Sequence, residues 1–506
     1  MADAVVLPRD EFNEVLVRNV HPPGRVNPRP AGRYHLVVIG AGAGGLVTAV
    51  GAASLGAKVA LVERHLLGGD CLNVGCVPSK AMIRASRVVE EIRKASEYGI
   101  EVRGSVDADF GAVMRRMRRV RAQISRVDSV QRLEGLGIDV FLGQASFSGD
   151  DTVAVDGQTL RFRKAVIAAG GRPHVPDVPG MPETGFLTNE TIFSLTERPG
   201  HLLVLGGGPI GCELAQAFRR LGSQVTVVTM DPHFLPREDA DAAEILDKRF
   251  HDEGIRFHFN SILTQVEKAG ARKRVTIDQG GADEQITLDV DEILVAAGRV
   301  PNVESLNLEA AGVAYDERGV RVSAQLRTTN RRVYAVGDIC LPFKFTHVSG
   351  TSGALAIQNA LFRGRKKWTD LVVPWCTYTD PEIAHVGLYE RDAKERGIPV
   401  DTFVHPLRHV DRALLDGDEE GFAKVHVRKG TDRILGATIV ARHAGELISE
   451  YTLAITGKLG LKVIAATIHP YPTQAEAVFH TAIAYQRSRL TPRTKKFLAL
   501  LLRLLA

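Results

Sequence analysis

The chain has 506 residues, too many for one hydrophobic core, so two to four domains are expected. Its composition, 44% hydrophobic and 24% charged, is ordinary for a globular protein and excludes disorder of the whole chain. A net charge of +5 does not by itself indicate nucleic-acid binding, and no such partner is expected. No apolar run reaches the roughly 18 residues that cross a bilayer, no secretory signal is recognisable, and five cysteines are too few for a disulfide scaffold. A cytoplasmic location is therefore expected.

The first part of the chain predicts an arm followed by a nucleotide-binding unit. Residues 1–34 are rich in proline and predict an extended arm with a short helix near 10–18. A buried strand at 35–39, a glycine-rich turn, a small-residue helix to about residue 56 and a second strand at 57–63 follow. This order of elements over about 30 residues is typical of a doubly wound fold.

The turn GAGAGG has glycine at the three positions that a dinucleotide-binding turn requires. Gly40 allows the tight turn, Gly42 lets the backbone approach a pyrophosphate, and Gly45 lets the helix pack on the strand. The helix start presents N–H groups and a partial positive charge to the phosphates. Glu63 ends the second strand, where a carboxylate can accept hydrogen bonds from ribose hydroxyls.

Two cysteines follow this unit, in the segment GGDCLNVGCVPSK. Cys71 and Cys76 are five residues apart, which on an ideal helix corresponds to about 7.5 Å along the axis, near or beyond the Cα limit for a disulfide. The pair therefore either does not bond or lies on an irregular backbone, which Gly75 permits. Pro78 suits the first turn of a helix, so Cys76 is expected near a helix N-terminus, where a thiol pKa is lowered. The alternative is a pair of buried structural cysteines; zinc is poorly supported because no second close pair of Cys or His appears.

The strand–turn–helix–strand pattern returns with a strand at 202–206, a helix at 212–222 and a strand at 223–229. Its turn, GGGPIG, supplies the glycines Gly206, Gly208 and Gly211. Two dinucleotide units in one chain suggest a flavin that exchanges electrons with a nicotinamide.

The second unit differs from the first at the position of the acidic residue, which is Thr229. A carboxylate there would favour a free 2′-hydroxyl, so its absence favours NADPH. Asp231, two residues further on, would instead favour NADH.

The remaining segments complete the predicted fold class: α/β, with two doubly wound (Rossmann-like) dinucleotide-binding domains and a C-terminal α+β domain. An Arg-rich helical stretch at 109–134 contains the run RRMRRVR, which predicts a solvated helix face, with an anionic partner surface as the alternative. From about residue 370, strands and helices follow without a third glycine turn, including helices near 444–459 and 474–488.

Six segments in chain order resemble the class I pyridine nucleotide–disulfide oxidoreductases, the family of dihydrolipoamide dehydrogenase, glutathione reductase and mercuric reductase. They are GGDCLNVGCVPSK, AAGGRPHVP, GGGPIGCELA, AAGRVPN, VYAVGDI and TDPEIAHVG, and the resemblance covers about residues 35–485. It implies FAD and NAD(P)H as cofactors and a homodimer. It also implies this division: an N-terminal extension (1–34), an FAD-binding domain (35–180), an NAD(P)-binding domain (181–299), a central part returning to FAD (300–369), a dimerisation domain (370–490) and a basic–apolar tail (491–506).

The resemblance further implies that electrons pass from NAD(P)H through FAD to the dithiol. Cys76 would be the thiolate against the flavin, and Cys71 would be the thiol that attacks substrate. Lys80 and Glu213 would form an ion pair near the reactive flavin nitrogen, and Asp338 would bind the ribityl or phosphate region of FAD. Motifs and resemblance together place cofactor binding at Gly40, Gly42, Gly45, Glu63, Lys80, Gly170, Gly206, Gly208, Gly211, Gly298, Gly337 and Asp338.

One segment departs from the disulfide reductases, which commonly carry a His–Pro–Thr–x–x–Glu stretch whose His, from the partner subunit, is the acid/base for the dithiol. In IHPYPTQAE, alignment on Pro472, Thr473 and Glu476 puts Tyr471 at the His position, and His469 lies two residues earlier. A phenol is a poor base at neutral pH, and a tyrosine here resembles mercuric reductase. Tyr471 and Glu476 complete the catalytic candidates; plain interface packing of Tyr471 and an inward swing of His469 are the alternatives.

The chain also lacks the metal-delivery thiols usual in mercuric reductases, since no cysteine follows Cys376 and no CxxC module precedes the first unit. No resident metal is expected. The tail 491–506 is basic and then apolar, too short to span a bilayer, and is expected either to lie in a membrane interface or to pack on the dimer.

The resulting hypothesis is a mercuric reductase-like, FAD-dependent NAD(P)H oxidoreductase that reduces a thiol-bound metal ion or a disulfide-type acceptor. A dihydrolipoamide dehydrogenase-type disulfide reductase is the first alternative. A flavin-bearing binding protein docked on a membrane or a partner is the second.

Overall fold

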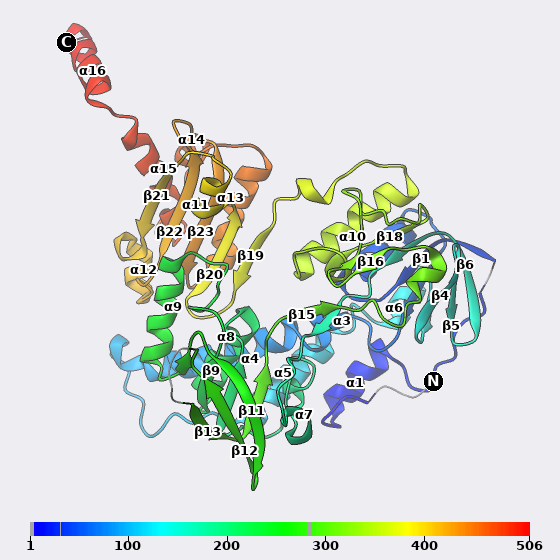
Figure 1. Cartoon of the computed structure of the whole chain (residues 1–506). Coiled ribbons are helices and arrows are strands. Elements are labelled where there is room, and N and C mark those ends of the chain that lie inside the picture. Colours follow the sequence, from blue (N-terminus) through cyan, green and yellow to red (C-terminus); the bar gives the residue numbers. More distant parts are fainter. Residues whose placement is uncertain (1–4, 31, 281–284, 506) are drawn as a thin grey trace. The chain divides into compact units, whose positions relative to one another are not determined.

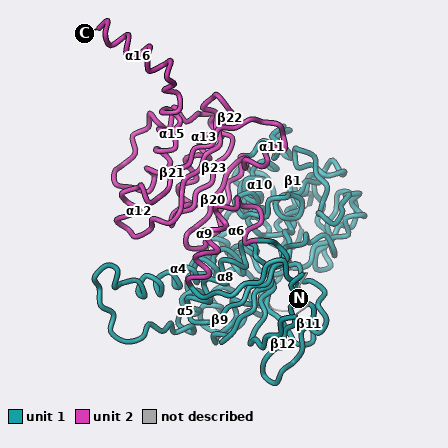
Figure 2. The backbone as a smooth tube through the Cα atoms, turned by 60° about the vertical axis from the view of Figure 1, so that its left-hand side comes forward, with its two compact units in different colours: residues 1–232, 253–371 teal, residues 233–252, 372–506 magenta. Residues whose placement is uncertain are grey.

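The computed structural model describes residues 5–30, 32–280 and 285–505 (Figure 1). The chain forms two compact units (Figure 2). The first contains residues up to 232 together with 253–371, and the second contains residues 233–252 and 372–506.

The first unit contains a seven-stranded sheet whose centre is parallel. Its strands are β1 (Arg33–Ile39), β2 (Val59–Glu63), β3 (Ile138–Leu142), β4 (Ala145–Gly149), β5 (Thr152–Val155), β6 (Gln158–Ile167) and β18 (Val333–Ala335). The order is β3-β2-β1-β6-β5-β4, with β18 also pairing with β6. Strands β1, β2, β3, β6 and β18 run parallel, whereas β4 and β5 continue the sheet antiparallel. The helices α2 (Ala43–Ser54) and α10 (Thr346–Leu361) pack against each other beside it.

A second parallel sheet of the same unit has the order β10-β9-β8-β14. Its strands are β8 (His201–Leu205), β9 (Gln224–Val228), β10 (Arg256–His258) and β14 (Glu292–Val295), and α8 (Pro209–Arg220) packs on it. An antiparallel sheet that the sequence pattern did not predict lies between β10 and β14 in the chain: β11 (Ile262–Ala269), β12 (Arg272–Asp278) and β13 (Ile286–Val290). Two short pairs complete the unit, β7 (Gly171–Pro173) with β15 (Arg299–Pro301) and β16 (Tyr315–Asp316) with β17 (Gly319–Val320).

Six further α-helices belong to the described part of the first unit. They are α1 (Glu11–Val20), α3 (Gly69–Asn73), α4 (Cys76–Arg93), α5 (Phe110–Ile124), α6 (Val130–Gly135) and α7 (Met181–Thr184). The expected strand–turn–helix–strand units and the short helix near 10–18 are confirmed, with ends shifted by a few residues.

The Arg-rich run does not form a fully solvated face. Arg118 and Arg121 of α5 are buried against α1, because Asp10 accepts from Arg118 Nε and Asn13 Oδ1 accepts from Arg121 Nη2 at 2.7 Å. Arg115 pairs with Glu11 at 2.5 Å at the exposed edge of the same contact. The N-terminal arm thus supplies the acceptors that part of the arginine run needs.

The second unit is the predicted separate α+β fold. Its antiparallel sheet has the order β19-β20-β23-β22-β21, and α13 (Ala444–Thr456) and α15 (Glu476–Ser488) pack on it. Its strands are β19 (Pro374–Thr377), β20 (Glu382–Gly387), β21 (Val400–Pro406), β22 (Phe422–Arg428) and β23 (Ile434–Ala441). The other helices are α9 (Ala240–Asp252), α11 (Glu390–Glu395), α12 (Asp411–Asp416), α14 (Leu461–Ala466) and α16 (Pro492–Leu505).

Candidate functional site

The two cysteines of the site lie on either side of a break between two helices. Cys71 belongs to α3, and Cys76 is the first residue of α4, so the backbone between them is not one continuous helix. A Cβ on Gly75 would stand 2.8 Å from the carbonyl oxygen of Asp70, so only glycine fits this break without a shift of the backbone. All five cysteines of the chain lie in the described part, and each is a free thiol.

The two thiols differ strongly in acidity. A hydrogen bond from Cys71, another with the Thr346 hydroxyl and the positive charge of Lys80 together lower the pKa of Cys76 to about 6. The Thr346 Oγ1 lies 3.4 Å from Cys76 Sγ. The same hydrogen bond to Cys76, together with burial, raises the pKa of Cys71. The pair therefore holds one proton on Cys71 and one negative charge on Cys76, which begins α4 where helix N–H groups favour an anion.

Lys80 and Glu213 come together although 133 residues separate them. Lys80 Nζ donates to Glu213 Oε2 at 2.6 Å, and the two helices that carry them, α4 and α8, pack against each other. Glu213 is buried, and Lys80 is about one-third exposed. Lys80 stands one turn after Cys76 on α4, so its charge acts on that thiolate.

Two arginines hold the cysteine segment in place. Arg121 Nη1 donates to the carbonyl oxygen of Asn73 at 2.6 Å. Arg299 pairs with Asp70 and donates to the carbonyl oxygen of Gly171 at 2.7 Å. Both contacts fix the backbone or side chains next to the thiols.

The first glycine turn fits a bound dinucleotide. Gly40 has φ of 100°, and a Cβ on Gly45 would overlap the carbonyl oxygen of Gly40, so both positions require glycine. Gly42 is the N-cap of α2 and carries no side chain in front of the first N–H groups of that helix. Glu63 accepts from the backbone N–H of Ala41 at 2.7 Å, and its burial raises its pKa.

A second carboxylate of the first unit faces the same sheet ends. Asp338 follows β18, and its burial raises its pKa, with Arg299 Nε 3.7 Å away. Gly337 precedes it with φ of 71°, and a Cβ there would be 2.5 Å from Ser349 Oγ. Gly170 and Gly298 lie in the connections after β6 and β14, each with positive φ.

The second glycine turn repeats this geometry with one difference. Gly206 has φ of 120°, and a Cβ on Gly211 would overlap the carbonyl oxygen of Gly206, whereas a Cβ on Gly208 would meet nothing within 4 Å. Gly208 is the N-cap of α8, so the space in front of that helix is open to a phosphate. At the end of β9, the Thr229 hydroxyl donates to Asp231 Oδ2 at 3.1 Å.

Tyr471 and His469 of the second unit are held by acidic side chains. The Tyr471 hydroxyl donates to Asp411 Oδ2 at 2.8 Å, and this hydrogen bond raises the pKa of the phenol. Its side chain is exposed, at 69%. His469 Nε2 lies 3.0 Å from Glu450 Oε1, and the imidazole is buried. Glu476 has a buried Oε2 without a hydrogen-bond partner in the described part of the chain.

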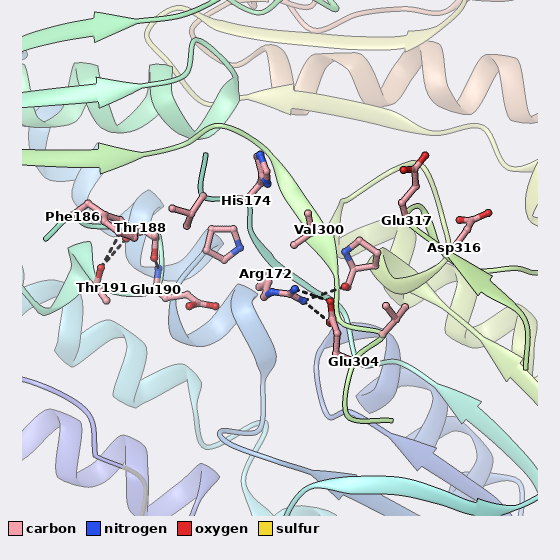
Figure 3. Close-up of a pocket in the computed structure, with 14 residues that line it drawn as sticks. Arg172, His174, Phe186, Thr188, Glu190, Thr191, Val300, Glu304, Asp316 and Glu317 are labelled. Atoms are coloured by element: carbon pink, nitrogen blue, oxygen red, sulfur yellow. Dashed lines mark hydrogen bonds and ion pairs between the residues drawn. The ribbon is translucent and has the colours of Figure 1, made fainter. Parts of the chain in front are cut away.

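A separate cavity of about 790 Å³ lies beside β7 and β15 (Figure 3). Arg172 on its wall forms a two-pronged ion pair with Glu304, with both N–O distances 2.9 Å. The rim also carries Glu190, Asp316 and Glu317, so the cavity is acidic. None of its 14 lining residues belongs to the thiol pair or to either glycine turn.

Within residues 5–30, 32–280 and 285–505, no group of three or more His, Cys, Asp or Glu side chains could hold a metal ion. A search of the same residues finds no helix with the length and apolar character of a membrane span.

Three residues of the site are not among the candidates that the sequence predicts. Thr346 contacts Cys76 from 270 positions away, and no local pattern marks it. Arg121 belongs to the arginine run RRMRRVR, which by itself predicts a solvated face. Arg299 lies in AAGRVPN, one of the six segments of the resemblance, and could have been found there.

Two family models match the chain. The pyridine nucleotide-disulphide oxidoreductase model matches residues 34–362, and the dimerisation domain of the same family matches residues 373–482. Mercuric reductase from Staphylococcus aureus is 35% identical over 457 residues, which cover 90% of this chain and 83% of that protein. Dihydrolipoyl dehydrogenase from Thermus scotoductus is 36% identical over 469 residues, which cover 90% of this chain and 98% of that protein.

Solved structures of similar proteins share the fold of this chain. The Cu(II) complex of the HOCl-induced flavoprotein disulfide reductase RclA from Escherichia coli has a TM-score of 0.80 at 29% identity and covers 90% of this chain and 100% of that one. LpdA from Mycobacterium tuberculosis has a TM-score of 0.80 at 28% identity, with 89% and 99% covered.

Proposed function

Because the chain belongs to the class I pyridine nucleotide–disulphide oxidoreductase family, and is therefore an FAD-dependent disulfide oxidoreductase, we propose that Cys71 and Cys76 use electrons from NAD(P)H to reduce a thiol-bound metal ion or a similar soft electrophile. The family consists of oxidoreductases, so the chain is an enzyme and not a flavin-bearing binding protein without turnover. The match to the family's dimerisation domain supports a homodimer.

Membership of the family implies which parts of the chain would bind the cofactors and the second subunit. Residues 35–180 and 300–369 would bind FAD, residues 181–299 the nicotinamide nucleotide, and residues 370–490 the second subunit. When bound, FAD supplies a carrier that takes two electrons from the nicotinamide and delivers them to the sulfur pair. Gly42 and the start of α2 would hold its pyrophosphate, Glu63 its ribose and Asp338 its ribityl or phosphate region.

The thiol pair is suited to a soft electrophile. Cys76 is the stable thiolate of the pair, held by Thr346 and Lys80. Cys71 keeps the proton, which it can pass to Cys76 along their shared hydrogen bond as its own sulfur attacks. A soft divalent metal ion would replace that proton between two thiolates, a ligand set that suits such ions. Reduction of a disulfide differs, because a proton must also reach the leaving thiolate.

The observation that carries this choice is the state of Tyr471 and His469. Tyr471 is tied to Asp411, which raises its pKa, and His469 is turned toward Glu450. The phenol of Tyr471 is thus a poor counterpart of the acid/base histidine that a disulfide reductase takes from its partner subunit, and His469 lies two residues away from the position at which that histidine aligns. The Cu(II) complex of the similar RclA structure agrees with a metal-related acceptor.

Dihydrolipoamide-type disulfide reduction is the second candidate, favoured by the 36% identity to dihydrolipoyl dehydrogenase. It requires an acid/base for the dithiol, and this chain carries Tyr471 at the position of the family's histidine.

The test is anaerobic turnover of the FAD-loaded protein with Hg(II), Cu(II), lipoamide, glutathione disulfide and quinones. We expect the metal ions to be reduced fastest, and Cys76→Ala to abolish that turnover while Cys376→Ala, a thiol of the second unit, leaves it unchanged. Faster turnover with lipoamide than with either metal ion would promote the second candidate. Full activity of Cys76→Ala would overturn the role of the thiol pair.

The nicotinamide preference can be tested in the same assay. We expect NADPH to be preferred, because Thr229 leaves no carboxylate at the ribose position of the second unit. Asp231, which accepts from the Thr229 hydroxyl, opposes a 2′-phosphate. Asp231→Asn should therefore raise the ratio of NADPH to NADH activity. A wild-type preference for NADH that Asp231→Asn leaves unchanged would show that neither residue decides the choice.

A further inference from the structure

The helix α16 (Pro492–Leu505) presents a large apolar surface that its own unit does not cover. None of its residues is buried, and Leu504 and Leu505 are each 76% exposed. In Figures 1 and 2 the helix stands clear of the five-stranded sheet of its unit. An exposed apolar face of this kind usually marks an interaction site.

The residues of α16 separate into two faces. At about 100° per residue, its Phe and Leu side chains occupy an arc of about 200°: Phe497, Leu498, Leu500, Leu501, Leu502, Leu504 and Leu505. Lys495, Lys496 and Arg503 lie in the remaining arc, and Arg493 stands in the first turn. The helix is therefore amphipathic, with cations along its polar side.

Charge distinguishes among the occupants that could cover the apolar face. Residues 490–505 contain four Lys or Arg and no Asp or Glu, in a chain whose whole net charge is +5. The same helix of a second copy could cover the apolar face, but it would leave the cations of both helices without anionic partners, because neither helix contains an acidic residue. An anionic surface matches the polar side, and an acyl layer matches the apolar side.

The length of α16 sets how it can meet such a surface. Fourteen residues rise about 21 Å, less than the roughly 30 Å of a bilayer core, so the helix cannot span it. It can lie in the plane of the interface, with its leucines below the headgroups and its cations among the phosphates.

We propose that α16 docks this enzyme on the surface of an anionic phospholipid bilayer. The proposal stands on residues of the second unit and is independent of the electron acceptor. A homodimer carries two copies of α16.

The experiment uses the full-length, FAD-loaded protein and vesicles of phosphatidylcholine alone or with 30% phosphatidylglycerol. We expect co-sedimentation with the anionic vesicles, weakened by added salt, and little with the neutral ones. Deletion of residues 491–506 should abolish binding without changing turnover in the absence of vesicles. Phe497→Trp should give a blue-shifted emission on binding, because the side chain enters an apolar layer.

Two sets of variants separate charge from apolar contact. Lys495→Gln/Lys496→Gln/Arg503→Gln should weaken binding about 100-fold, since three cations are lost from the surface. Arg365→Gln/Lys366→Gln/Lys367→Gln removes three exposed cations of the first unit and should leave binding unchanged. Leu501→Ser/Leu504→Ser should also abolish binding, whereas Leu415→Ser, an exposed leucine of α12, should not.

Three results would overturn the proposal. The first is equal binding by the full-length and deleted proteins. The second is binding that ignores phosphatidylglycerol. The third is loss of the dimer, measured by light scattering without vesicles, in Leu501→Ser/Leu504→Ser, since α16 would then cover a second copy of the chain.

Discussion

Replacement of Thr346 by valine tests the electrostatics of the thiol pair most directly. Thr346 is the first residue of α10, and its hydroxyl is 3.4 Å from Cys76 Sγ. Valine has nearly the same shape but neither donates nor accepts a hydrogen bond. The substitution therefore removes one interaction with the thiolate and leaves Lys80 in place.

The size of the effect follows from the contact. A hydrogen bond to a charged group is worth about 1.5–3 kcal/mol, and the 3.4 Å contact at an exposed sulfur belongs at the low end. One pKa unit corresponds to about 1.4 kcal/mol, so the pKa of Cys76 should rise by about one unit from its value of about 6. At pH 6 the thiolate fraction would then fall from about one half to about one tenth.

The assay is the rate of iodoacetamide alkylation of Cys76 in the reduced protein between pH 4 and 10, with the modified residue identified by mass spectrometry. The midpoint should lie near pH 6 in the wild type and about one unit higher in Thr346→Val. Thr346→Ser keeps the hydroxyl and should restore the wild-type midpoint. Cys71→Ala should raise it further than Thr346→Val, because the hydrogen bond from Cys71 is the largest cause of the shift. Identical profiles for wild type and Thr346→Val would refute this account.

The remaining predictions concern the turns, the buried arginine and pH. Gly211→Ala should lower thermal stability, because its Cβ would overlap the carbonyl oxygen of Gly206. Gly208→Ala should fold normally but raise the KM for the nicotinamide at least about ten-fold, because its Cβ points into the open space before α8. Equal melting temperatures of the two variants would contradict this. Arg121→Met should lower the free energy of unfolding in urea by about 2–3 kcal/mol and speed alkylation of the cysteines, because the contacts with Asn73 and Asn13 are lost. Arg119→Met, which replaces an exposed arginine of the same helix, is the matched control. A loss of unfolding free energy as small as that of the control would mean that the two contacts contribute little. The lowered pKa of Cys76 should make the reduced protein more stable as the pH rises from about 6 to about 9, and the raised pKa of Cys71 should reverse this trend above about pH 9. A reduced Cys76→Ser variant with the same pH dependence of melting temperature would disprove this account.

The features that could be predicted from sequence are those in which a local pattern is tied to a local physical need. The glycine turns are of this kind, because Gly40 and Gly206 require positive φ and Gly45 and Gly211 leave no room for a Cβ. The break at Gly75 is one of two outcomes that the sequence left open, because a disulfide between cysteines five residues apart does not fit one continuous helix. In each case the residues that impose the geometry lie within a few positions of the residue that shows it.

Interactions between distant segments explain what the sequence pattern missed. An arginine run is usually a solvated face, because a guanidinium is costly to bury without partners, and here burial lowers the pKa of Arg121 to about 10. Its acceptors are Asn13 in the N-terminal arm and the backbone of Asn73 beside the thiols, which are 108 and 48 residues away. The arginine run alone indicates that burial would be unfavourable, but it does not show the distant hydrogen-bond acceptors that offset this cost. Arg121 therefore links the N-terminal arm, which precedes the first nucleotide unit, to the cysteine segment, which follows it. Truncation of the arm should accordingly change the rate at which the two cysteines are alkylated.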